Sequence, residues 1–138
     1  MPREDEVAHV AEEWMRRARS NLARAKQEKP SDAVWEDLCF DAQQAAEKAL
    51  KAVLVRFKIE FPKTHAMEPL FHLLETSGHP VPPSLLKAKD LTDYAVEMRY
   101  PFPEEGEEVT EEDYRAAVAM AQEIVDWAEK VTGDENEL

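Results

Sequence analysis

The segment AQQAAEKALKAVL, residues Ala42–Leu54, decides the fold that we expect for this chain. It lies within a run from Asp32 to Lys58 in which apolar residues recur every three or four positions, the spacing of one helix face. That face consists of Val34, Leu38, Ala42, Ala45, Ala49, Val53 and Phe57. A helix of this length extends about 40 Å, and its small alanines let a second helix approach closely. We therefore predict that it forms the central rod of a helical domain.

Four other segments show the same helical spacing. They are Val7–Gln27, a short helix that ends near Thr76, Ser84–Arg99 and Glu111–Val131. Capping signals mark several ends: Ser31 or Asp32 before the central helix, Gly78 after the short one, and Thr110 with Asp113 before the last. Amphipathic helices joined by short connections predict an all-α fold, an up-and-down antiparallel bundle of about five helices.

The size and composition agree with one helical domain. A chain of 138 residues is the size of a single domain, which we expect over residues 1–132, followed by a disordered acidic tail at 133–138. The one cysteine, Cys39, cannot form an intrachain disulfide, and the first residues lack the apolar region of a signal peptide. No apolar run approaches the ~20 residues of a membrane-spanning helix. These features predict a cytoplasmic protein with no membrane partner.

The net charge of −13 is distributed unevenly along the chain. Residues 101–138 hold 13 acidic and 2 basic residues, a net charge of −11, whereas residues 1–100 hold 17 and 15, a net charge of −2. The first helix is enriched in positive charge by Arg16, Arg17, Arg19, Arg24, Lys26 and Lys29. We expect an electrically polarised molecule, in which non-specific binding to a phosphate backbone is disfavoured.

The sharper enzyme signatures are absent from the sequence. It contains no glycine-rich phosphate loop, no paired cysteine ligands and no His-Glu-x-x-His. Glu6 and His9 have the spacing of a di-metal ligand pair, but a chance arrangement of surface residues explains them better. Cys39 is interpreted as a buried structural thiol. Neither a metal site nor a cofactor is therefore expected. The tryptophans Trp14, Trp35 and Trp127 are expected in the core or in a dimer interface.

Four stretches together resemble the HEPN domain family (higher eukaryotes and prokaryotes nucleotide-binding). They are WMRRARSNLARA at 14–25, LCFDAQQAAEKALKAVLVRFKIEFPKTH at 38–65, LFHLLE at 70–75 and RYP at 99–101. The resemblance implies a helical bundle that pairs as a homodimer. It also implies a toxin–antitoxin-type or nucleotide-handling module, because small prokaryotic members are commonly encoded beside a minimal nucleotidyltransferase.

Many HEPN members are ribonucleases, and the resemblance implies an Arg followed a few residues later by a His near the end of the bundle. Here Arg99 is followed by YPFPEEGEEVTEED, and no histidine occurs after His79. A literal match at Arg3 to His9 lies at the wrong end of the chain and is interpreted as coincidence. The sequence thus resembles the branch that carries Arg-Tyr-Pro in place of the ribonuclease motif.

We take Arg99, Tyr100, His65 and Lys48 as candidate nucleotide- or partner-binding residues, and we assign no catalytic residue. In the alternative interpretation, Arg99 is a cation that stabilises a helix C-terminus, Tyr100 packs on the bundle, and His65 caps or packs. Lys48 lies with Gln43, Gln44, Glu47 and Lys51 on the flanks of the central helix, which are either a solvated face or a contact surface.

Three functions follow from these observations. The first is a non-catalytic HEPN protein, the homodimeric partner of a minimal nucleotidyltransferase, with nucleotide or RNA binding as a further role. The second is a divergent HEPN ribonuclease toxin that uses Arg99 with Tyr100 or His65. The third is an acidic helical adaptor whose last helix docks to a basic partner. The first is favoured, so enzymatic activity is not expected.

Overall fold

The computed structural model describes residues 3–96 and 108–133. Its helices are α1 (Glu4–Ala25), α2 (Trp35–Arg56), α3 (Met67–Thr76), α4 (Thr92–Val96) and α5 (Glu111–Gly133), with a 3₁₀ helix, η1 (Pro83–Leu91), directly before α4. These described residues contain no β-strand. The prediction of an all-α bundle of about five helices is confirmed.

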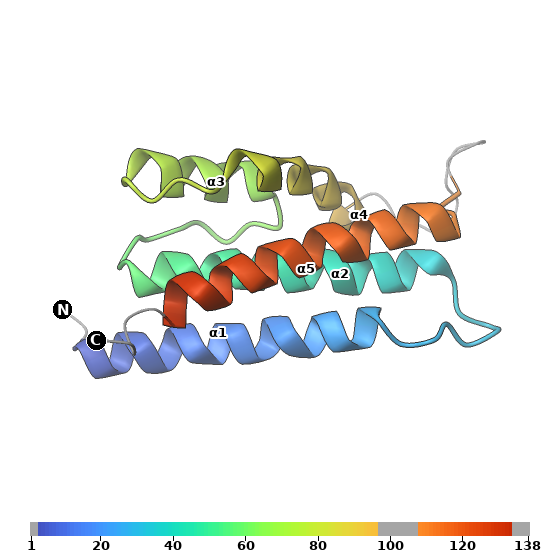
Figure 1. Cartoon of the computed structure of the whole chain (residues 1–138), viewed down its shortest axis with the longest axis horizontal. Helices are drawn as coiled ribbons and strands as arrows, with labels where there is room; N and C mark the ends of the chain where they lie inside the picture. Colours follow the sequence, from blue (N-terminus) through green and yellow to red (C-terminus); the bar gives the residue numbers. More distant parts are fainter. Residues whose placement is uncertain (1–2, 97–107, 134–138) are drawn as a thin grey trace.

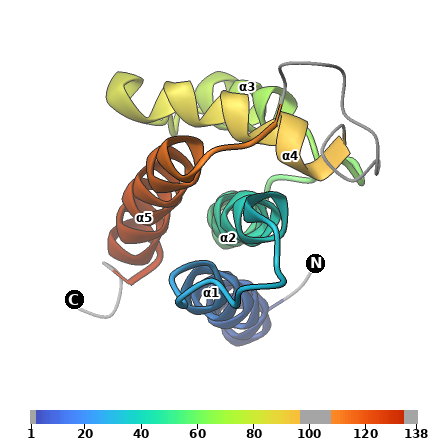
Figure 2. The same cartoon turned by 90° about the vertical axis from the view of Figure 1, so that its right-hand side faces the viewer.

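Helix α2 is the centre of the bundle. Figure 1 shows α1 antiparallel to α2 and α5, since the start of α1 lies at the same end as the ends of the other two. Viewed along the helices in Figure 2, α1 and α5 pack against α2 from two directions, and α3 and α4 lie above it. Fourteen of the 22 residues of α2 are buried, so the predicted central rod is confirmed.

Alanines make this close packing possible. Ala42, Ala45, Ala46, Ala49 and Ala52 of α2 have no exposed surface, and neither do Ala18 and Ala25 of α1 or Ala117, Ala121 and Ala128 of α5. A side chain of one carbon lets helix backbones approach each other, while the larger Met15, Leu50, Leu54 and Ile124 fill the space between them. The core therefore runs along both long sides of α2.

The connector between α2 and α3 returns along α2 because one residue adopts the left-handed backbone conformation. At the end of α2, the backbone N–H of Lys58 donates to Val55 and that of Ile59 donates to Leu54, both at 2.9 Å. Lys58 has φ +59°, the left-handed conformation of a C-terminal helix cap. The chain reverses at this cap, and Gln43 of α2 then donates a hydrogen bond to the carbonyl of His65 at 3.1 Å.

The fourth predicted helix, Ser84–Arg99, is only partly correct. The chain forms a 3₁₀ helix from Pro83 to Leu91 and becomes α-helical at Thr92. The buried residues of η1 are Leu85, Ala88 and Leu91, a strict spacing of three that places them on one side of a helix with three residues per turn. The predicted helix beyond Val96 lies outside the described residues.

Several predicted boundaries are also corrected. Helix α2 begins at Trp35, not at a cap formed by Ser31 or Asp32, and Val34 has no side-chain cap and is 50% exposed. Trp35 instead packs on Tyr114 of α5, with ring centroids 4.8 Å apart. Helix α1 begins at Glu4 and ends at Ala25. The predicted cap Gly78 is confirmed, with φ +85° and its own hydrogen bond to Glu75.

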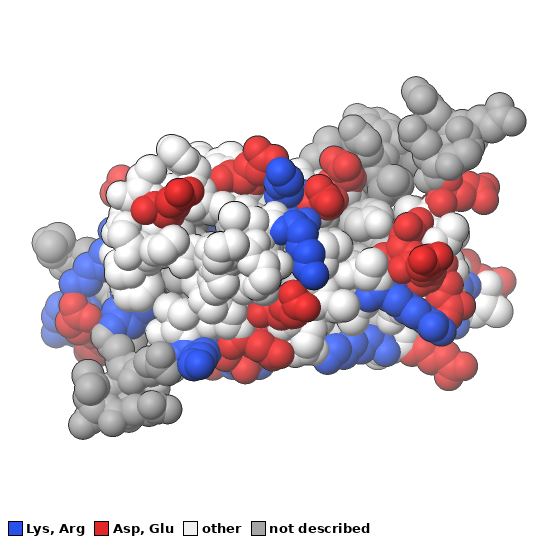
Figure 3. Space-filling view, turned by 45° about the horizontal axis from the view of Figure 1, so that its top comes forward, with Lys and Arg blue, Asp and Glu red and all other residues white. Residues whose placement is uncertain are grey.

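The start of α5 matches its prediction. Thr110 and Asp113 form a reciprocal capping box: the backbone N–H of Asp113 donates to Thr110 Oγ1 at 3.1 Å, and that of Thr110 donates to Asp113 Oδ2 at 3.0 Å. Figure 3 shows acidic side chains gathered at the end of the molecule where α5 begins. The predicted acidic tail after Gly133 lies outside the described residues.

Candidate functional site

A buried polar cluster lies along α2, at positions where a core helix would ordinarily carry apolar residues. Its centre is Glu47, whose side chain is 3% exposed. One carboxylate oxygen accepts hydrogen bonds from Gln43 Nε2 at 2.9 Å and Gln44 Nε2 at 3.4 Å, and the other accepts one from Lys51 Nζ at 2.7 Å. Among the described residues, no buried side-chain nitrogen or oxygen lacks a partner. The cluster is therefore a satisfied network that holds Glu47 rigidly.

His65 joins this network from the connector. Its Nδ1 lies 3.0 Å from Glu47 Oε1, while its side chain is 58% exposed. Because an ionised carboxylate only accepts hydrogen bonds, His65 Nδ1 is the donor in this contact. The second ring nitrogen, Nε2, is not engaged by Glu47. A buried acid thus orients the ring of a histidine that reaches the surface.

The pKa of Glu47 lies below its usual value. Burial alone would raise this pKa, but hydrogen bonds from Lys51, Gln43 and His65 outweigh burial because they stabilise the charged form. Glu47 is therefore ionised at neutral pH. A buried carboxylate that is ionised attracts the proton on His65 Nδ1 and keeps the ring in place.

Lys51 closes the opposite side of the cluster. Its ammonium group lies 5.6 Å from the ring centroid of Trp14 and 5.8 Å from that of Phe61, two rings in edge-to-face contact. The charge of Lys51 is thus balanced by Glu47 and by two aromatic faces. Lys51 links the cluster to α1 and to the connector, and its ion pair leaves it unsuited to bind a ligand.

Lys48 belongs to a different set of contacts. Its Nζ donates to Asn21 Oδ1 at 2.7 Å, and Asn21 Nδ2 donates to Asp41 Oδ1 at 3.1 Å. Burial lowers the pKa of Lys48. The structure therefore directs Lys48 toward α1, whereas His65 contacts Glu47 from the connector, so these two predicted site residues do not share a partner.

Arg99 and Tyr100 lie outside the described residues. The chain that leads to them passes close to His65, since Thr92 Oγ1 accepts a hydrogen bond from the backbone N–H of Met67 at 3.1 Å. Thr92 precedes Arg99 by seven residues, and Met67 follows His65 by two. The beginning of α4 is thus attached to the segment that carries His65.

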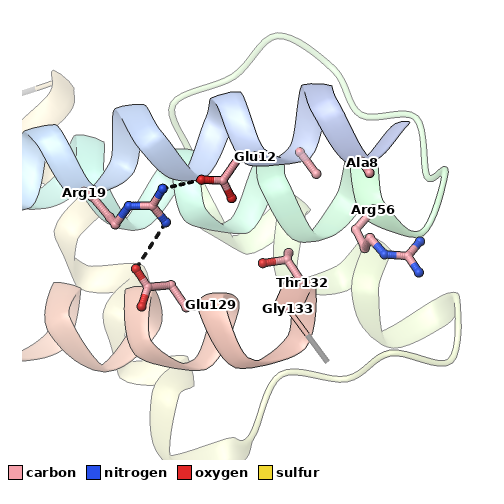
Figure 4. Close-up of a pocket in the computed structure, with 8 residues that line it drawn as sticks. Ala8, Glu12, Arg19, Arg56, Glu129, Thr132 and Gly133 are labelled. Carbon is pink, nitrogen blue, oxygen red and sulfur yellow. Dashed lines mark hydrogen bonds and ion pairs between the residues drawn. The ribbon is translucent and has the colours of Figure 1, made fainter. Parts of the chain in front are cut away.

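A hollow lies between α1 and α5, apart from the cluster. It has a volume of about 570 Å³, and its lining includes Glu12, Arg19, Arg56, Glu129 and Thr132. Figure 4 shows the guanidinium group of Arg19 between Glu12 and Glu129, with which it forms ion pairs, and Arg56 at the other end. Burial would lower the pKa of Arg19, but the two carboxylates outweigh burial and raise it. The Arg19–Glu129 ion pair joins α1 to α5, while the Arg19–Glu12 pair lies within α1.

Sequence reasoning missed the burial of Gln43, Gln44, Glu47 and Lys51. A solvated flank was one of the two interpretations of these residues, and the structure contradicts it: all four are buried. The sequence did contain a signal of this burial. The polar residues at positions 43, 47 and 51 recur every fourth position and so share one side of a helix that carries apolar residues on several other sides. Their partner His65 is far away in sequence and could not be identified from spacing.

The described residues offer little for metal or thiol chemistry. They contain no group of three or more His, Cys, Asp or Glu side chains placed to hold a metal ion. Cys39 is buried, and burial raises the pKa of its thiol to about 12. No helix in the described part of the chain is long and apolar enough to cross a membrane.

Comparison with known proteins agrees with this architecture. The HEPN domain model matches residues 11–131, from α1 to α5. The crystal structure of ST0689, an archaeal HEPN homologue, superimposes with a TM-score of 0.68 at 30% sequence identity, covering 88% of this chain and 97% of that one. Searching curated proteins gives no match. The family model thus matches nearly the whole length of this chain, and the similarity to the HEPN homologue extends over nearly the whole length of that protein. The chain belongs to the HEPN domain family.

Proposed function

We propose that this chain is a non-catalytic HEPN protein that binds a nucleotide at His65 and acts as the homodimeric partner of a minimal nucleotidyltransferase. The observation that carries the proposal is the pairing of a buried Glu47 with an exposed His65 at 3.0 Å. This geometry presents an oriented hydrogen-bonding nitrogen at the surface with little loss of side-chain entropy on binding.

The sequence supports a binding role over a catalytic one. Ribonuclease members of the family pair an Arg with a nearby His, and this chain has no histidine after His79. Arg99 and Tyr100 then act as contacts for the nucleotide or for the nucleotidyltransferase. The partnership places the protein in a toxin–antitoxin-type module.

Nucleotide binding is tested by calorimetry with ATP, using His65→Asn and a matched control. His72→Asn is that control, because His72 is an exposed histidine on α3 outside the cluster. We expect about tenfold weaker binding for His65→Asn, the loss of one well-placed hydrogen bond, and unchanged binding for His72→Asn. Equal affinity in both variants would remove His65 from the site.

The nucleotidyltransferase partnership is tested by co-purification of this chain with a minimal nucleotidyltransferase from the same organism. We expect a stable complex that Arg99→Ala weakens. A complex that forms equally well with Arg99→Ala would remove Arg99 from the interface, and no complex at all would refute the partnership.

A second candidate function, a divergent ribonuclease, is favoured by the same Glu47–His65 pair. Nε2 of an imidazole oriented by a carboxylate can accept the proton of a ribose 2′-hydroxyl. Incubation of the purified protein with assorted RNAs, with and without EDTA, decides between the functions. Cleavage that His65→Asn abolishes would establish the ribonuclease, and intact RNA in every sample would exclude it.

A further inference from the structure

Another hollow lies between α1 and α2, and a lysine lines it. Its volume is about 490 Å³, within the range of roughly 300–1,000 Å³ that small-molecule sites occupy. Neither His65 nor Glu47 belongs to its lining, so it is separate from the site of the proposed function. We call it the Lys48 hollow, and its lining consists of His9, Val10, Glu13, Trp14, Arg17 and Lys48.

The amine of Lys48 is held by a neutral side chain. Its Nζ donates a hydrogen bond to Asn21 Oδ1 at 2.7 Å, and Asn21 is itself buried. A lysine that is partly removed from water usually pairs with a carboxylate. Because the acceptor here is uncharged, the amine can lose its proton and still donate to Asn21. The neutral nitrogen then carries a lone pair that can attack an electrophile.

The surroundings of Lys48 favour this neutral form. Its pKa lies below the usual value, and burial is the largest cause. Arg17 and Arg24 of α1 lower the pKa further, whereas Glu47 and Asp41 of α2 act in the opposite direction. Lys48 therefore has a larger neutral fraction than an ordinary lysine, and the amine that lines the hollow is a reactive one.

The Lys48 hollow lies where α1 changes from acidic to basic. From Glu4 to Glu13, α1 has five acidic residues and no Lys or Arg, whereas from Arg16 to Lys26 the chain has five basic residues and no acid. The lining contains one acid and two bases, a formal charge of +1 in a chain of −13. A small anion is therefore attracted to this hollow more than to most of the surface.

Arg17 is the group that can bind such an anion. Glu13 contacts Arg17 through Nε at 3.1 Å, and Glu13 also pairs with Arg16 at 2.6 Å. The charge of this one carboxylate is thus shared between two guanidinium groups. A guanidinium has five N–H donors, and it binds the oxygens of a phosphate group in pairs.

The rest of the lining offers apolar surface. Val10 is 45% exposed, and Trp14 is half-buried. The ring of Trp14 packs edge-to-face on Phe61, with ring centroids 6.4 Å apart, and this contact holds the ring in place. A small molecule that combines a phosphate with a short apolar group therefore matches the lining, with the phosphate at Arg17.

We propose that Lys48 is a modification site that takes an acyl group from an acyl phosphate, the mixed anhydride of a carboxylic acid and phosphate. The neutral amine attacks the carbonyl carbon, so that a C–N bond forms. The bond from this carbon to the phosphate oxygen breaks, and the phosphate leaves with the electron pair and takes up the proton from the nitrogen. The products are an amide on Lys48 and hydrogen phosphate, and Arg17 stabilises the charge of the leaving group.

The amide product fits the same surroundings. An acylated lysine keeps one N–H, which can still donate to Asn21. It has lost the positive charge that burial, Arg17 and Arg24 disfavour. The formal charge of the lining falls from +1 to zero, and the modified protein should keep its fold, which circular dichroism measures.

Mass spectrometry of the full chain after incubation with acetyl phosphate tests the proposal. Lys87 and Lys130 are the internal controls, because they are exposed on η1 and α5. At pH 8 we expect Lys48 to be acetylated about tenfold faster than either control, since both its neutral fraction and the local concentration of the reagent are higher. Its rate should also reach a plateau at a lower pH than theirs.

Two variants separate recognition of the phosphate from reactivity of the amine. Arg17→Gln should slow acetylation of Lys48 by acetyl phosphate about tenfold, the loss of one charge-assisted contact. It should slow acetylation by the N-hydroxysuccinimide ester of acetic acid much less, because that reagent carries no phosphate. Arg115→Gln makes the same change on α5, where Arg115 pairs with Glu111, and should leave both rates unchanged.

Two outcomes would overturn the proposal. The first is acetylation of Lys48 that is no faster than that of Lys87 and Lys130. The second is an equal effect of Arg17→Gln on both reagents, because Arg17 would then act on the amine alone and not on the phosphate. Nucleotide binding at His65 is measured separately, so either result would leave the proposed function untouched.

Discussion

Replacing Glu47 by Gln should destabilise the protein strongly, although the two side chains have nearly the same shape. Glutamine keeps an oxygen that can accept from Gln43 or His65, but its amide nitrogen faces Lys51 Nζ, which Glu47 binds at 2.7 Å. The side chain of Lys51 is 10% exposed and would be left without its counter-ion. Breaking one side of a buried ion pair costs about 3–5 kcal/mol.

This magnitude corresponds to a large change in melting temperature. The entropy of unfolding is about 2.1 cal/mol/K per residue, which for 138 residues gives about 290 cal/mol/K. A loss of 3–5 kcal/mol then lowers the melting temperature by about 10–17 °C. Urea unfolding followed by circular dichroism measures the same loss directly. Every variant must be compared at one protein concentration, because a dimer unfolds in a concentration-dependent way.

A double variant separates the ion pair from the rest of the cluster. Combining Glu47→Gln with Lys51→Met removes both charges, so it should be more stable than Glu47→Gln alone. Glu123→Gln is the control, since Glu123 forms an exposed ion pair with Lys87 at 3.9 Å and should change the stability by less than about 0.5 kcal/mol. Additive effects of Glu47→Gln and Lys51→Met, or a loss below about 1 kcal/mol for the single variant, would refute the reasoning.

The pH dependence of this effect has a definite sign. The pKa of Glu47 is lower in the folded protein than its ordinary value of 4.5. Its contribution to stability is therefore complete above pH 4.5 and is lost as the pH falls through the lower pKa of the folded state. The difference in unfolding free energy between wild type and Glu47→Gln should shrink in acid, and a difference that grows would contradict the assignment.

Three more predictions concern the framework around the cluster. Lys58→Gly should be about 1 kcal/mol more stable than Lys58→Ala in urea unfolding, because both lose the side chain but only glycine adopts φ +59° without strain; equal stability would contradict this account. The Cys39 thiol should resist alkylation by iodoacetamide at pH 8 until the protein unfolds, since burial raises its pKa to about 12, and rapid labelling of the native protein would refute its burial. Tyr114→Phe should cost about 1 kcal/mol, because the hydroxyl group donates to the carbonyl of Ala25 at 2.6 Å, and unchanged stability would show that water replaces this bond.

Local patterns were sufficient to predict most of the helical framework. The apolar spacing of α2 and α5 and the capping box of Thr110 and Asp113 depend on residues within a few positions of one another. The 3₁₀ helix escaped prediction, because Leu85, Ala88 and Leu91 also satisfy part of an α-helical pattern. The start of α2 was misplaced because Ser31 and Asp32 lie in a turn, which the hydrogen bond from the backbone N–H of Ala33 to the carbonyl of Pro30 closes at 3.0 Å, so neither residue caps the helix.

The candidate site was only partly predictable. His65 was selected from the sequence, but its partner Glu47 was grouped with residues whose solvated or contact role was left open. The sequence by itself determined most of the helices, the division of charge along α1 and the resemblance to the HEPN family, since each is encoded in local order. Only the tertiary structure decided that Glu47 is buried and that His65 is exposed beside it. The connector that joins them reverses at Lys58, and burial depends on which helices surround a residue and not on its neighbours in the chain.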